Sequence, residues 1–413
     1  MHLLLSAEDS EAELRSELTQ SFAGRPAVEA RLADESEVRS ADCGDMRVRR
    51  DAPAPMLIEA DLQIIPGQRL PHLAFARQLL AHALPVRAES VRAWANRLFA
   101  SVAGVLPDGQ PWSLHIEPHY DVRTAPRIGA RAWHTRLRNA ECGMRAAAGL
   151  ASVDAEAGRH RCWLTGEALA DLLHRKRRHL LRHLRHEPVR FSKKDSLVQL
   201  LLTAPDAGFL SVAVAPLPSE QRHLVSPFPK GDVPAASDKT APSRAFAKLL
   251  EAELRMGRAI TAGEICVDLG AAPGSWTYVA VNRGARVVAV DRSPLREDLM
   301  QSSQVKFEPG DAFRFRPARP VDWLLCDVIA APERTASLLI EWLRRGWCRY
   351  FVVTAKLGDW QREPLAPGAD ALAVLKRELP PMTGELWLTR LCANKREVCA
   401  FGSANNLPDN ASI

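Results

Sequence analysis

Residues 264–291 read EICVDLGAAPGSWTYVAVNRGARVVAVD, and this stretch decides the fold. Its first part, Ile265 to Leu269, is a short apolar run that predicts a buried strand with Asp268 near its end. Gly270 and the Pro273-Gly274 pair then predict a tight turn into a helix that begins near Ser275. A strand, a glycine turn and a helix N-terminus in this order indicate a βα unit whose turn lets a ligand approach the backbone.

The second strand of this stretch ends beside an acid. Residues 286–290, RVVAV, are followed by Asp291, and a carboxylate in that place accepts hydrogen bonds from ribose hydroxyls. A nicotinamide or flavin site would show G-x-G-x-x-G, whereas the spacing here is Gly270-x-x-x-Gly274 with proline in the turn. The alternative that the glycines merely close a turn agrees less well, because Asp291 is an independent signal for a nucleoside ligand.

The elements around this stretch predict an α/β domain with a doubly wound, largely parallel sheet. A helix is expected over residues 243–256 with Ser243 as its N-cap. The other expected strands are 305–307, 323–328 and 350–355, and the other expected helices are 333–345 and 369–378. Two late strands at 385–391 and 397–401, with no helix between them, predict an antiparallel hairpin at the edge of the sheet.

Two smaller units are predicted upstream. The first combines a strand at 2–6, a helix at 8–20, a strand-like run at 56–65 and a helix at 90–103. The second begins near Trp112 with an alternating strand and continues with helices at 131–148 and 166–184 and a hairpin of strands 198–204 and 209–215. Residues 216–242 carry six prolines, so they are either a linker or an ordered connection laid over a surface.

Composition sets wide bounds on the chain. Its 413 residues suffice for two or three domains, and 46% hydrophobic with 25% charged residues is ordinary for a soluble globular protein. The eight cysteines include no C-x-x-C pair, which indicates buried thiols in a reducing compartment. Acidic residues follow the opening apolar run too early for a secretory signal, and no later run is long enough to span a membrane, so we expect a cytoplasmic protein.

The strongest charge pattern is the basic run, residues 174–195, HRKRRHLLRHLRHEPVRFSKKD. Its cations are Arg175, Lys176, Arg177, Arg178, Arg182, Arg185, Arg190, Lys193 and Lys194. Only Glu187 and Asp195 oppose them, whereas an ordinary solvated helix face mixes signs. We therefore expect a phosphate-binding surface that positions RNA without reading its sequence.

The glycine turn carries a resemblance to a known class of enzyme. D-x-G-x-x-P-G-x-W at residues 268–276 resembles motif I of S-adenosylmethionine methyltransferases of the FtsJ-like kind, which methylate ribose 2′-oxygens. A ribose hydroxyl holds its proton tightly, so its methylation calls for a base. A lysine serves if its pKa of about 10.4 is lowered towards neutrality by a second ammonium group or by desolvation. We therefore expect two lysines together with acids that orient them.

Four residues at the ends of predicted elements fit this expectation: Lys248, Asp327, Lys356 and Glu397. Taken singly, each has a structural explanation; Asp327 can cap a helix, and Glu397 can protect an edge strand. Other methyl acceptors fit less well. Base C5 methylation needs a cysteine nucleophile, and Cys326 lies inside an apolar strand. Amine methylation would predict an Asn/Asp-Pro-Pro-aromatic run, which DVIAAP is not, and no spacing indicates a metal site.

A wider set of motifs resembles the ribosomal large-subunit RNA 2′-O-methyltransferase M family. The matching segments are S-R-x-x-x-K-L at 243–249, D-L-G-A-x-P-G-x-W-T-Y at 268–278, V-D at 290–291, G-D-x-F-x-F-R-P at 310–317, C-D at 326–327, W-L-x-x-G-W-C-R at 342–349, K-L at 356–357 and R-E-V at 396–398. The match is strong after residue 243 and weaker before it. It implies a ferredoxin-like domain over 1–105, a THUMP-like RNA-binding domain over 106–217, a linker over 218–242, a Rossmann-like catalytic domain over 243–405 and a tail over 406–413.

The resemblance also implies roles for residues. Lys248, Asp327, Lys356 and Glu397 would form the catalytic tetrad, with Lys356 as the general base. The pocket for S-adenosylmethionine would comprise Asp268, Gly270, Ala272, Pro273, Gly274, Ser275, Trp276, Asp291, Asp311 and Asp327. Asp291 would hold the ribose hydroxyls, Asp311 would lie by the adenine and Asp327 by the sulfonium, while Trp276 is better explained by packing behind the turn.

The chain departs from the family pattern at two positions. Ala245 replaces a serine, which removes one polar contact to the cofactor, and Ser275 replaces a glycine. The resemblance implies methylation of a cytidine in 23S ribosomal RNA, either as free RNA or in an assembling large-subunit particle, by a protein that we expect to be monomeric and not membrane-bound. The alternative is an RNA-binding assembly factor that keeps the cofactor-binding fold without turnover.

Overall fold

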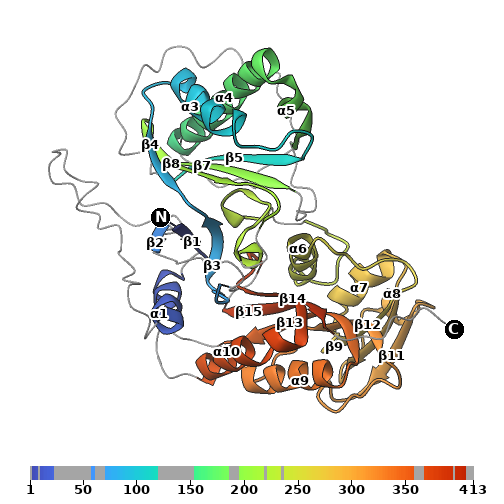
Figure 1. Ribbon diagram of the computed structural model, residues 1–413. Coiled ribbons are helices and arrows are strands. Elements are labelled where there is room, and N and C mark those ends of the chain that lie inside the picture. The colour runs from blue at the N-terminus through green and yellow to red at the C-terminus, as the bar shows by residue number, and fades with distance from the viewer. Residues whose placement is uncertain are drawn as a thin grey trace.

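The computed structural model describes residues 2–7, 10–22, 57–60, 70–119, 153–185, 195–217, 221–233, 237–357, 367–393 and 396–405. Three sheets occur in this part of the chain, with strand orders β2-β1-β3, β4-β8-β7-β5-β6 and β11-β10-β9-β12-β13-β15-β14. Figure 1 shows the seven-stranded sheet with its helices at one end of the molecule and the five-stranded sheet with α3, α4 and α5 at the other.

The seven-stranded sheet confirms the doubly wound prediction. Its strands are β9 (Ile265–Leu269), β10 (Arg286–Asp291), β11 (Val305–Pro309), β12 (Val321–Cys326), β13 (Cys348–Lys356), β14 (Thr383–Thr389) and β15 (Glu397–Ala404). β9 to β13 are mutually parallel, and β15 pairs antiparallel with both β13 and β14. The predicted antiparallel pair is therefore present, with its second strand on the inside and β14 at the edge.

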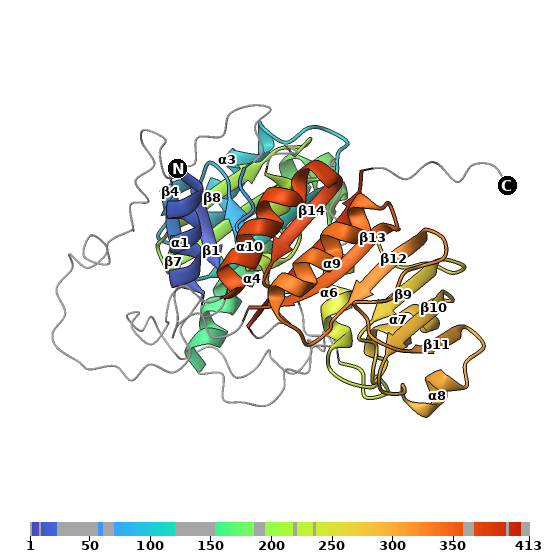
Figure 2. The ribbon, with the colours of Figure 1, turned by 90° about the horizontal axis from the view of Figure 1, so that it is seen from below.

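Helices cover both faces of this sheet. α6 (Phe246–Met256) and α7 (Ser275–Asn282) pack on one face, and α9 (Pro332–Arg344) and α10 (Pro367–Glu378) on the other; Figure 2 shows α9 and α10 side by side over the strands. The short α8 spans Glu297–Met300. Strands buried on both faces read as continuous apolar runs, and FVV at 351–353 is such a run.

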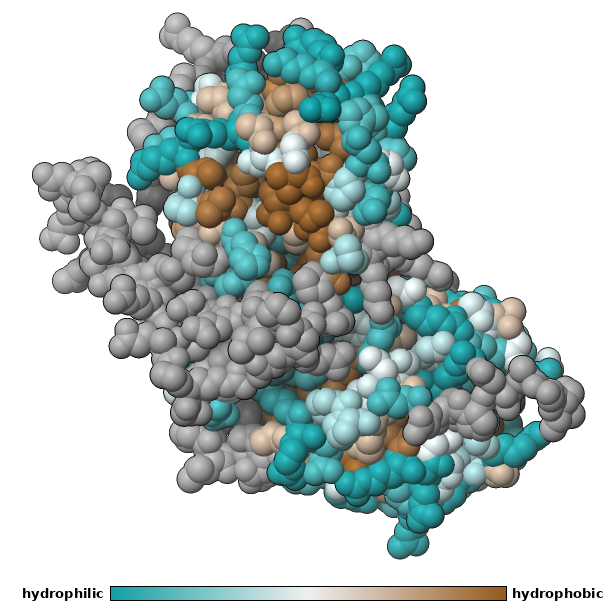
Figure 3. Space-filling view, in the orientation of Figure 1, coloured by the Kyte–Doolittle hydropathy of each residue, from teal (hydrophilic) through white to brown (hydrophobic). Residues whose placement is uncertain are grey.

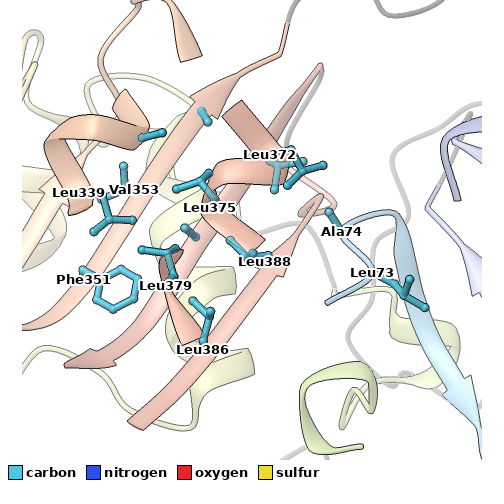
Figure 4. Packing of buried hydrophobic residues seen from close by; sticks show 14 of the residues in the cluster. Leu73, Ala74, Leu339, Phe351, Val353, Leu372, Leu375, Leu379, Leu386 and Leu388 are labelled. Atoms are coloured by element: carbon cyan, nitrogen blue, oxygen red, sulfur yellow. The ribbon is translucent and has the colours of Figure 1, made fainter. Parts of the chain in front are cut away.

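The core under α9 and α10 is built from leucines on the helices and large side chains on the strands. Leu339, Leu375 and Leu379 are fully or almost fully buried, as are Phe351 and Leu386 beneath them. Figure 4 shows these side chains meeting between the two layers. Burial of one such leucine stabilises the fold by about 1.5–3 kcal/mol. This layer therefore holds the sheet in place, and the candidate site lies at one edge of that sheet.

The five-stranded sheet contains β4 (Leu84–Arg87), β5 (Trp112–Pro118), β6 (Leu184–Arg185), β7 (Ser196–Ala204) and β8 (Ala207–Ala213). The hairpin of β7 and β8 is confirmed. α3 (Val91–Ala103) packs against α4 (Val153–Lys176), and both share a core with this sheet. The helix expected for the first unit and the strand β4 before it therefore pack with the second unit, because Trp94 and Leu98 are buried against α4 and the sheet.

The first unit is a three-stranded antiparallel sheet of β1 (His2–Ser6), β2 (Leu57–Ala60) and β3 (Ala76–Leu80), with α1 (Glu11–Phe22) beside it. The stretch after β8 is an ordered connection where it is described. It contains the single turns η2 (Arg222–Leu224) and η3 (Pro229–Gly231), and Val225 and Phe228 are buried. A further single turn, η4, spans Pro380–Met382.

Several local predictions need correction or lie outside the described residues. The expected helix at 166–184 begins at Val153 and breaks at Arg177, whose φ of −148° separates α4 from α5 (Arg178–His183). The expected helix at 131–148 falls outside the described residues. Six of the cysteines are described and free, five of them buried. No helix among the described residues has the length and apolar character that crossing a membrane requires.

Candidate active site

The site lies where the parallel strands of the seven-stranded sheet end. Gly270 follows β9, Asp291 ends β10, Asp311 follows β11, Asp327 follows β12 and Lys356 ends β13. Carboxyl ends of parallel strands meet at one edge of a sheet, so these five residues from distant parts of the chain become neighbours. The edge is the place at which open α/β sheets bind their ligands.

Two further residues reach this edge from other elements. The antiparallel register of β13 and β15 sets Glu397 directly opposite Lys356, so the first residue of β15 lies at the end of β13. Lys248 comes from the first turn of α6. Ser243 is not the N-cap of that helix, because α6 begins at Phe246; the Ser243 hydroxyl instead meets the Ser275 hydroxyl at 2.7 Å.

The glycine turn requires glycine at both predicted positions. Gly270 has φ of 74° and Gly274 has φ of 107°, values that L-residues rarely adopt. A Cβ on Gly270 would lie 3.0 Å from the Val328 Cα, and one on Gly274 would lie 2.3 Å from the Leu299 Cδ1. The turn is therefore packed tightly against the loop after β12 and against α8, which holds its backbone in place for a ligand.

Asp291 is anchored by backbone donors. The Ala272 N–H donates to its Oδ2 at 3.0 Å and the Ser293 N–H to its Oδ1 at 2.9 Å. A carboxylate has about four lone-pair sites, so two remain to accept hydrogen bonds from a ribose diol. The carboxylate is thus joined to the glycine turn, as a nucleoside site requires.

Asp311 is held in a similar way. The Phe313 N–H donates to its Oδ1 at 2.9 Å, and the exposed Arg292 guanidinium lies 3.1 Å from its Oδ2. These two contacts, the backbone N–H first, keep the pKa of Asp311 below its usual value. Arg292 was missed by the sequence analysis; its place directly after Asp291 was the only available signal.

The four tetrad residues form one cluster of alternating charge. The Lys248 Nζ lies 3.1 Å from an Asp327 oxygen and 2.6 Å from the Glu397 Oε1. The Lys356 Nζ donates to the Asp327 Oδ1 at 2.6 Å and also donates to the Glu397 Oε2. Each lysine thus contacts both carboxylates, and the structure brings all four predicted residues together.

Burial differs across the tetrad. The Lys356 side chain is 25% exposed, against 10% for Lys248 and 8% for Glu397. Lys356 is therefore the amine most open to an incoming acceptor. Glu397 lies deepest, and the two ammonium groups outweigh its desolvation, so its pKa lies below the usual value.

The expected lowering of the Lys356 pKa is not found. Desolvation lowers the pKa of this amine, but Asp327 and Glu397 together outweigh it, so the pKa lies above the usual 10.5. The sequence indicates a second ammonium group and burial, but it cannot show that both carboxylates contact the same amine. The two acids therefore hold the proton on the Lys356 amine.

Two predicted pocket residues are buried under the turn. Trp276 is 3% exposed, and its indole N–H donates to the Ala245 carbonyl at 2.8 Å, so its side chain packs behind the turn. Asp268 is 2% exposed and accepts a hydrogen bond from the Thr277 hydroxyl at 2.7 Å. Burial raises the pKa of Asp268 to about 7. Thr277, which the sequence analysis missed, lies inside the motif that it quoted.

The basic run lies on the other unit, at the end of α4 and along α5. Arg175, Lys176, Arg177, Arg178 and Arg182 are exposed, and hydrophilic residues cover this part of the molecule in Figure 3. Arg185 is different, because it pairs with the buried Asp195 at 3.1 Å. Arg190, Lys193 and Lys194 lie outside the described residues.

No cluster of three or more potential metal ligands occurs in the described parts of the chain. The site instead offers a glycine turn, two backbone-anchored carboxylates and a lysine–carboxylate cluster. These groups suit a ligand that contains a nucleoside and a positively charged centre. The Asp291 and Asp311 carboxylates offer hydrogen-bond acceptors to the nucleoside, and the Asp327 carboxylate can face the positive charge.

Comparison with known proteins gives the class of this unit. Residues 241–345 match the family model described as FtsJ-like methyltransferase, so this part of the C-terminal unit is similar to methyltransferase domains of that type. The match covers β9 to β12, the glycine turn, Lys248 and Asp327. The fold and the family model therefore agree on the same part of the chain.

The chain is also similar to named relatives. A protein from Thauera aminoaromatica named Ribosomal RNA large subunit methyltransferase M is 38% identical over 199 residues, which cover 47% of this chain and 54% of the relative. One of the same name from Azotobacter vinelandii is 46% identical over 134 residues, covering 30% of this chain and 37% of the relative. The chain thus spans about half the length, or less, of these curated relatives.

Proposed function

We propose that this protein transfers a methyl group from S-adenosylmethionine to a ribose 2′-oxygen of a cytidine in 23S ribosomal RNA. The observation that carries the proposal is the mutual contact of Lys248, Asp327, Lys356 and Glu397 at the sheet edge that also holds Asp291. Its relatives' printed name, Ribosomal RNA large subunit methyltransferase M, supports ribosomal RNA as the substrate.

The residues present fit the cofactor. Asp291 would accept hydrogen bonds from its ribose hydroxyls, Asp311 would lie by the adenine, and Gly270, Ala272, Pro273, Gly274 and Ser275 would line its approach. Asp327 would face the sulfonium, which supplies a methyl group on positively charged sulfur when the cofactor is bound. The family pattern has a serine where this chain has Ala245. The Ser243 and Ser275 hydroxyls, which contact each other close to Ala245, would supply polar groups to the same part of the pocket.

The tetrad supplies the proton chemistry. Lys356 must lose its own proton to act as a base, and added positive charge beside Asp327 favours that loss. The neutral amine would then accept the proton of the 2′-hydroxyl, and the cofactor, held by Asp291, Asp311 and the glycine turn, would supply the methyl group to that oxygen. Lys248, Asp327 and Glu397 position Lys356 and hold the charge of the site nearly balanced.

The other units would hold the RNA. The exposed cations Arg175 to Arg182 would contact phosphates, consistent with the implied THUMP-like role of residues 106–217 and with a ferredoxin-like first domain. Residues 218–242 would connect these units to the catalytic domain over 243–405. We place the protein in the cytoplasm as a monomer that acts on 23S RNA or on an assembling large-subunit particle.

The second candidate is an RNA-binding assembly factor that keeps the fold without turnover. The raised pKa of Lys356 favours it, because a protonated amine is no base. The two candidates differ in one measurable property, the transfer of label from the cofactor to RNA.

The test uses the full chain, methyl-labelled S-adenosylmethionine and ribosomal RNA from cells that lack the protein. We expect label in 23S RNA at a single nucleotide that resists alkaline cleavage on its 3′ side, as a 2′-O-methylated ribose does. Label on a base would contradict the ribose assignment. The absence of label, with RNA and cofactor both bound, would favour the assembly factor.

A further inference from the structure

The loop between β12 and α9, residues 327–331 with the sequence DVIAA, presents an unusual side chain. Ile329 is 92% exposed, the highest value among large hydrophobic side chains in the described ranges; Leu84 follows at 63%. Single apolar residues on a surface are common and need no explanation by themselves. The position of Ile329 is what matters, because it lies two residues after Asp327 of the tetrad.

The loop is held firmly at both ends. Cys326 before it is fully buried, and Pro332 after it is the buried first residue of α9. Val328 packs against the glycine turn, since a Cβ on Gly270 would come within 3.0 Å of the Val328 Cα. Ile329 is therefore presented to solvent by a fixed backbone, with its Cα at most about 7 Å from that of Asp327.

The proposed acceptor must come close to this loop. Its ribose hydroxyl must reach the Lys356 Nζ, which lies 2.6 Å from the Asp327 Oδ1. The base of that nucleotide is a flat ring with apolar faces, and enzymes that do chemistry on a base take it out of its stack and hold it between aromatic or apolar side chains. A ribose hydroxyl held at Lys356 would bring the attached base close to the same loop. After Asp327 the loop has no charged residue that would favour phosphate over a base.

We propose that Ile329 is the apolar contact for the base of the acceptor nucleotide once that base has left its stack. The inference rests on the proposed function, because it assumes that a nucleotide is the acceptor at Lys356. It adds a residue that contacts RNA at the point of reaction, in contrast to the basic run, which contacts phosphates elsewhere.

The test compares Ile329→Ala with Ile329→Leu, and uses Leu84→Ala as the control for loss of an exposed apolar side chain outside the site. Methylation of ribosomal RNA from cells lacking the protein is measured for each variant, together with its affinity for S-adenosylmethionine and its melting temperature. We expect Ile329→Ala to lower kcat/KM for RNA by roughly 4-fold or more, the effect of losing about one CH2 group of apolar contact. Ile329→Leu should restore most of the activity.

A second readout follows the base directly. A short RNA carries a fluorescent analogue of the base at the methylated position, whose emission reports stacking. Binding of the wild-type protein should change this emission, and the change should be smaller with Ile329→Ala but normal with Leu84→Ala. Cofactor affinity and melting temperature should stay at wild-type values in all variants, because Ile329 makes no core contact.

The outcomes separate the two proposals. No methylation by the wild-type protein would overturn the proposed function. Methylation by the wild-type protein with an equal kcat/KM for Ile329→Ala would overturn only the role of Ile329. A loss of cofactor affinity or of melting temperature in Ile329→Ala would overturn it as well, since the side chain would then support the fold or the cofactor pocket.

Discussion

The tetrad residues are positioned by one another. Each lysine contacts both carboxylates, and each carboxylate contacts both lysines. Loss of any one side chain would therefore disturb the positions of the other three. The arrangement explains why a lysine can be buried beside another lysine at all, because two acids offset the mutual repulsion. Lys356 can therefore act as a base only after the charge around its amine has changed.

Asp268 gives a prediction at the same scale. Burial raises its pKa from 3.8 to about 7, so between these values the folded state binds more protons than the unfolded state. Stability must then fall as pH rises through this window. Asp268→Asn keeps an acceptor for Thr277 without the buried charge, so we expect a higher free energy of unfolding at pH 8, by up to about 4 kcal/mol, and little change at pH 4.

Denaturant unfolding at the two pH values measures this difference. Asp108→Asn, a change at an exposed aspartate of the other unit, serves as the control and should shift neither value. An equal gain from Asp268→Asn at pH 4 and pH 8 would show that the buried charge is not its cause.

At the scale of elements, the seven-stranded sheet was largely predictable. Its strands are short apolar runs, its helices have one apolar face, and glycine and proline punctuate the turns, so the alternation of β and α could be read directly. The position of β15 between β13 and β14 could not be predicted, because pairing depends on packing between distant segments. That pairing is what places Glu397 opposite Lys356.

The basic run shows a second limit of sequence patterns. A count of charges could not reveal that Arg185 pairs with buried Asp195, or that the helix breaks at Arg177. The break at Arg177 separates α5 from α4, and the exposed cations fall on both helices.

The exposed cations make a prediction about RNA affinity. Replacing Arg175, Arg178 and Arg182 by glutamate should weaken RNA binding and flatten its dependence on salt. Loss of three phosphate contacts lowers the slope of log affinity against log salt by roughly 2–3. Filter binding over a series of salt concentrations measures the slope.

The matched control reverses Arg286, Arg319 and Arg349, three exposed arginines of the catalytic unit away from the tetrad. Affinity for S-adenosylmethionine should be unchanged in both sets of variants. A slope that falls equally in the control would mean that only net charge matters, and that the basic run is no specific RNA surface.

At the scale of the whole molecule, the first unit and the catalytic sheet share one core. Leu73 and Ala74 of the first unit lie beside the edge of the seven-stranded sheet (Figure 4), and the Arg390 N–H donates to the Ala74 carbonyl at 2.7 Å. Glu17 of α1 is buried, and it accepts from the Ala74 and Phe75 N–H groups and from Lys376 of α10. The position of the first unit is therefore fixed relative to the active site.

The contacts of Glu17 with Ala74, Phe75 and Lys376 lead to a prediction about local stability. Glu17→Ala leaves two buried amides and Lys376 without their acceptor, and loss of one partner of a buried ion pair costs about 3–5 kcal/mol. We expect faster hydrogen exchange at Ala74 and Phe75, measured by mass spectrometry. Glu11→Ala, which removes a half-exposed partner of Arg15 on the same helix, should leave exchange at these amides unchanged.

If exchange at Ala74 and Phe75 is as slow in Glu17→Ala as in the wild type, the shared core alone holds the first unit against the catalytic unit. No local sequence pattern could have predicted the Glu17–Lys376 ion pair, because the two residues are 359 positions apart and each looks like a surface charge on its own helix. The sequence indicated separate units, but it assigned residues 90–103 to the first unit, whereas they pack with the second, and it could not show how the units attach.

The most direct measurement of the central claim is a single methyl-transfer turnover by Lys356→Ala, with Lys306→Ala as the control for loss of an exposed lysine of the same sheet. We expect a rate lower by about 10²–10⁴-fold for Lys356→Ala, with RNA and S-adenosylmethionine still bound at near wild-type affinity, and an unchanged rate for Lys306→Ala. Transfer by Lys356→Ala at the wild-type rate would contradict this claim, because the tetrad would then carry no proton chemistry.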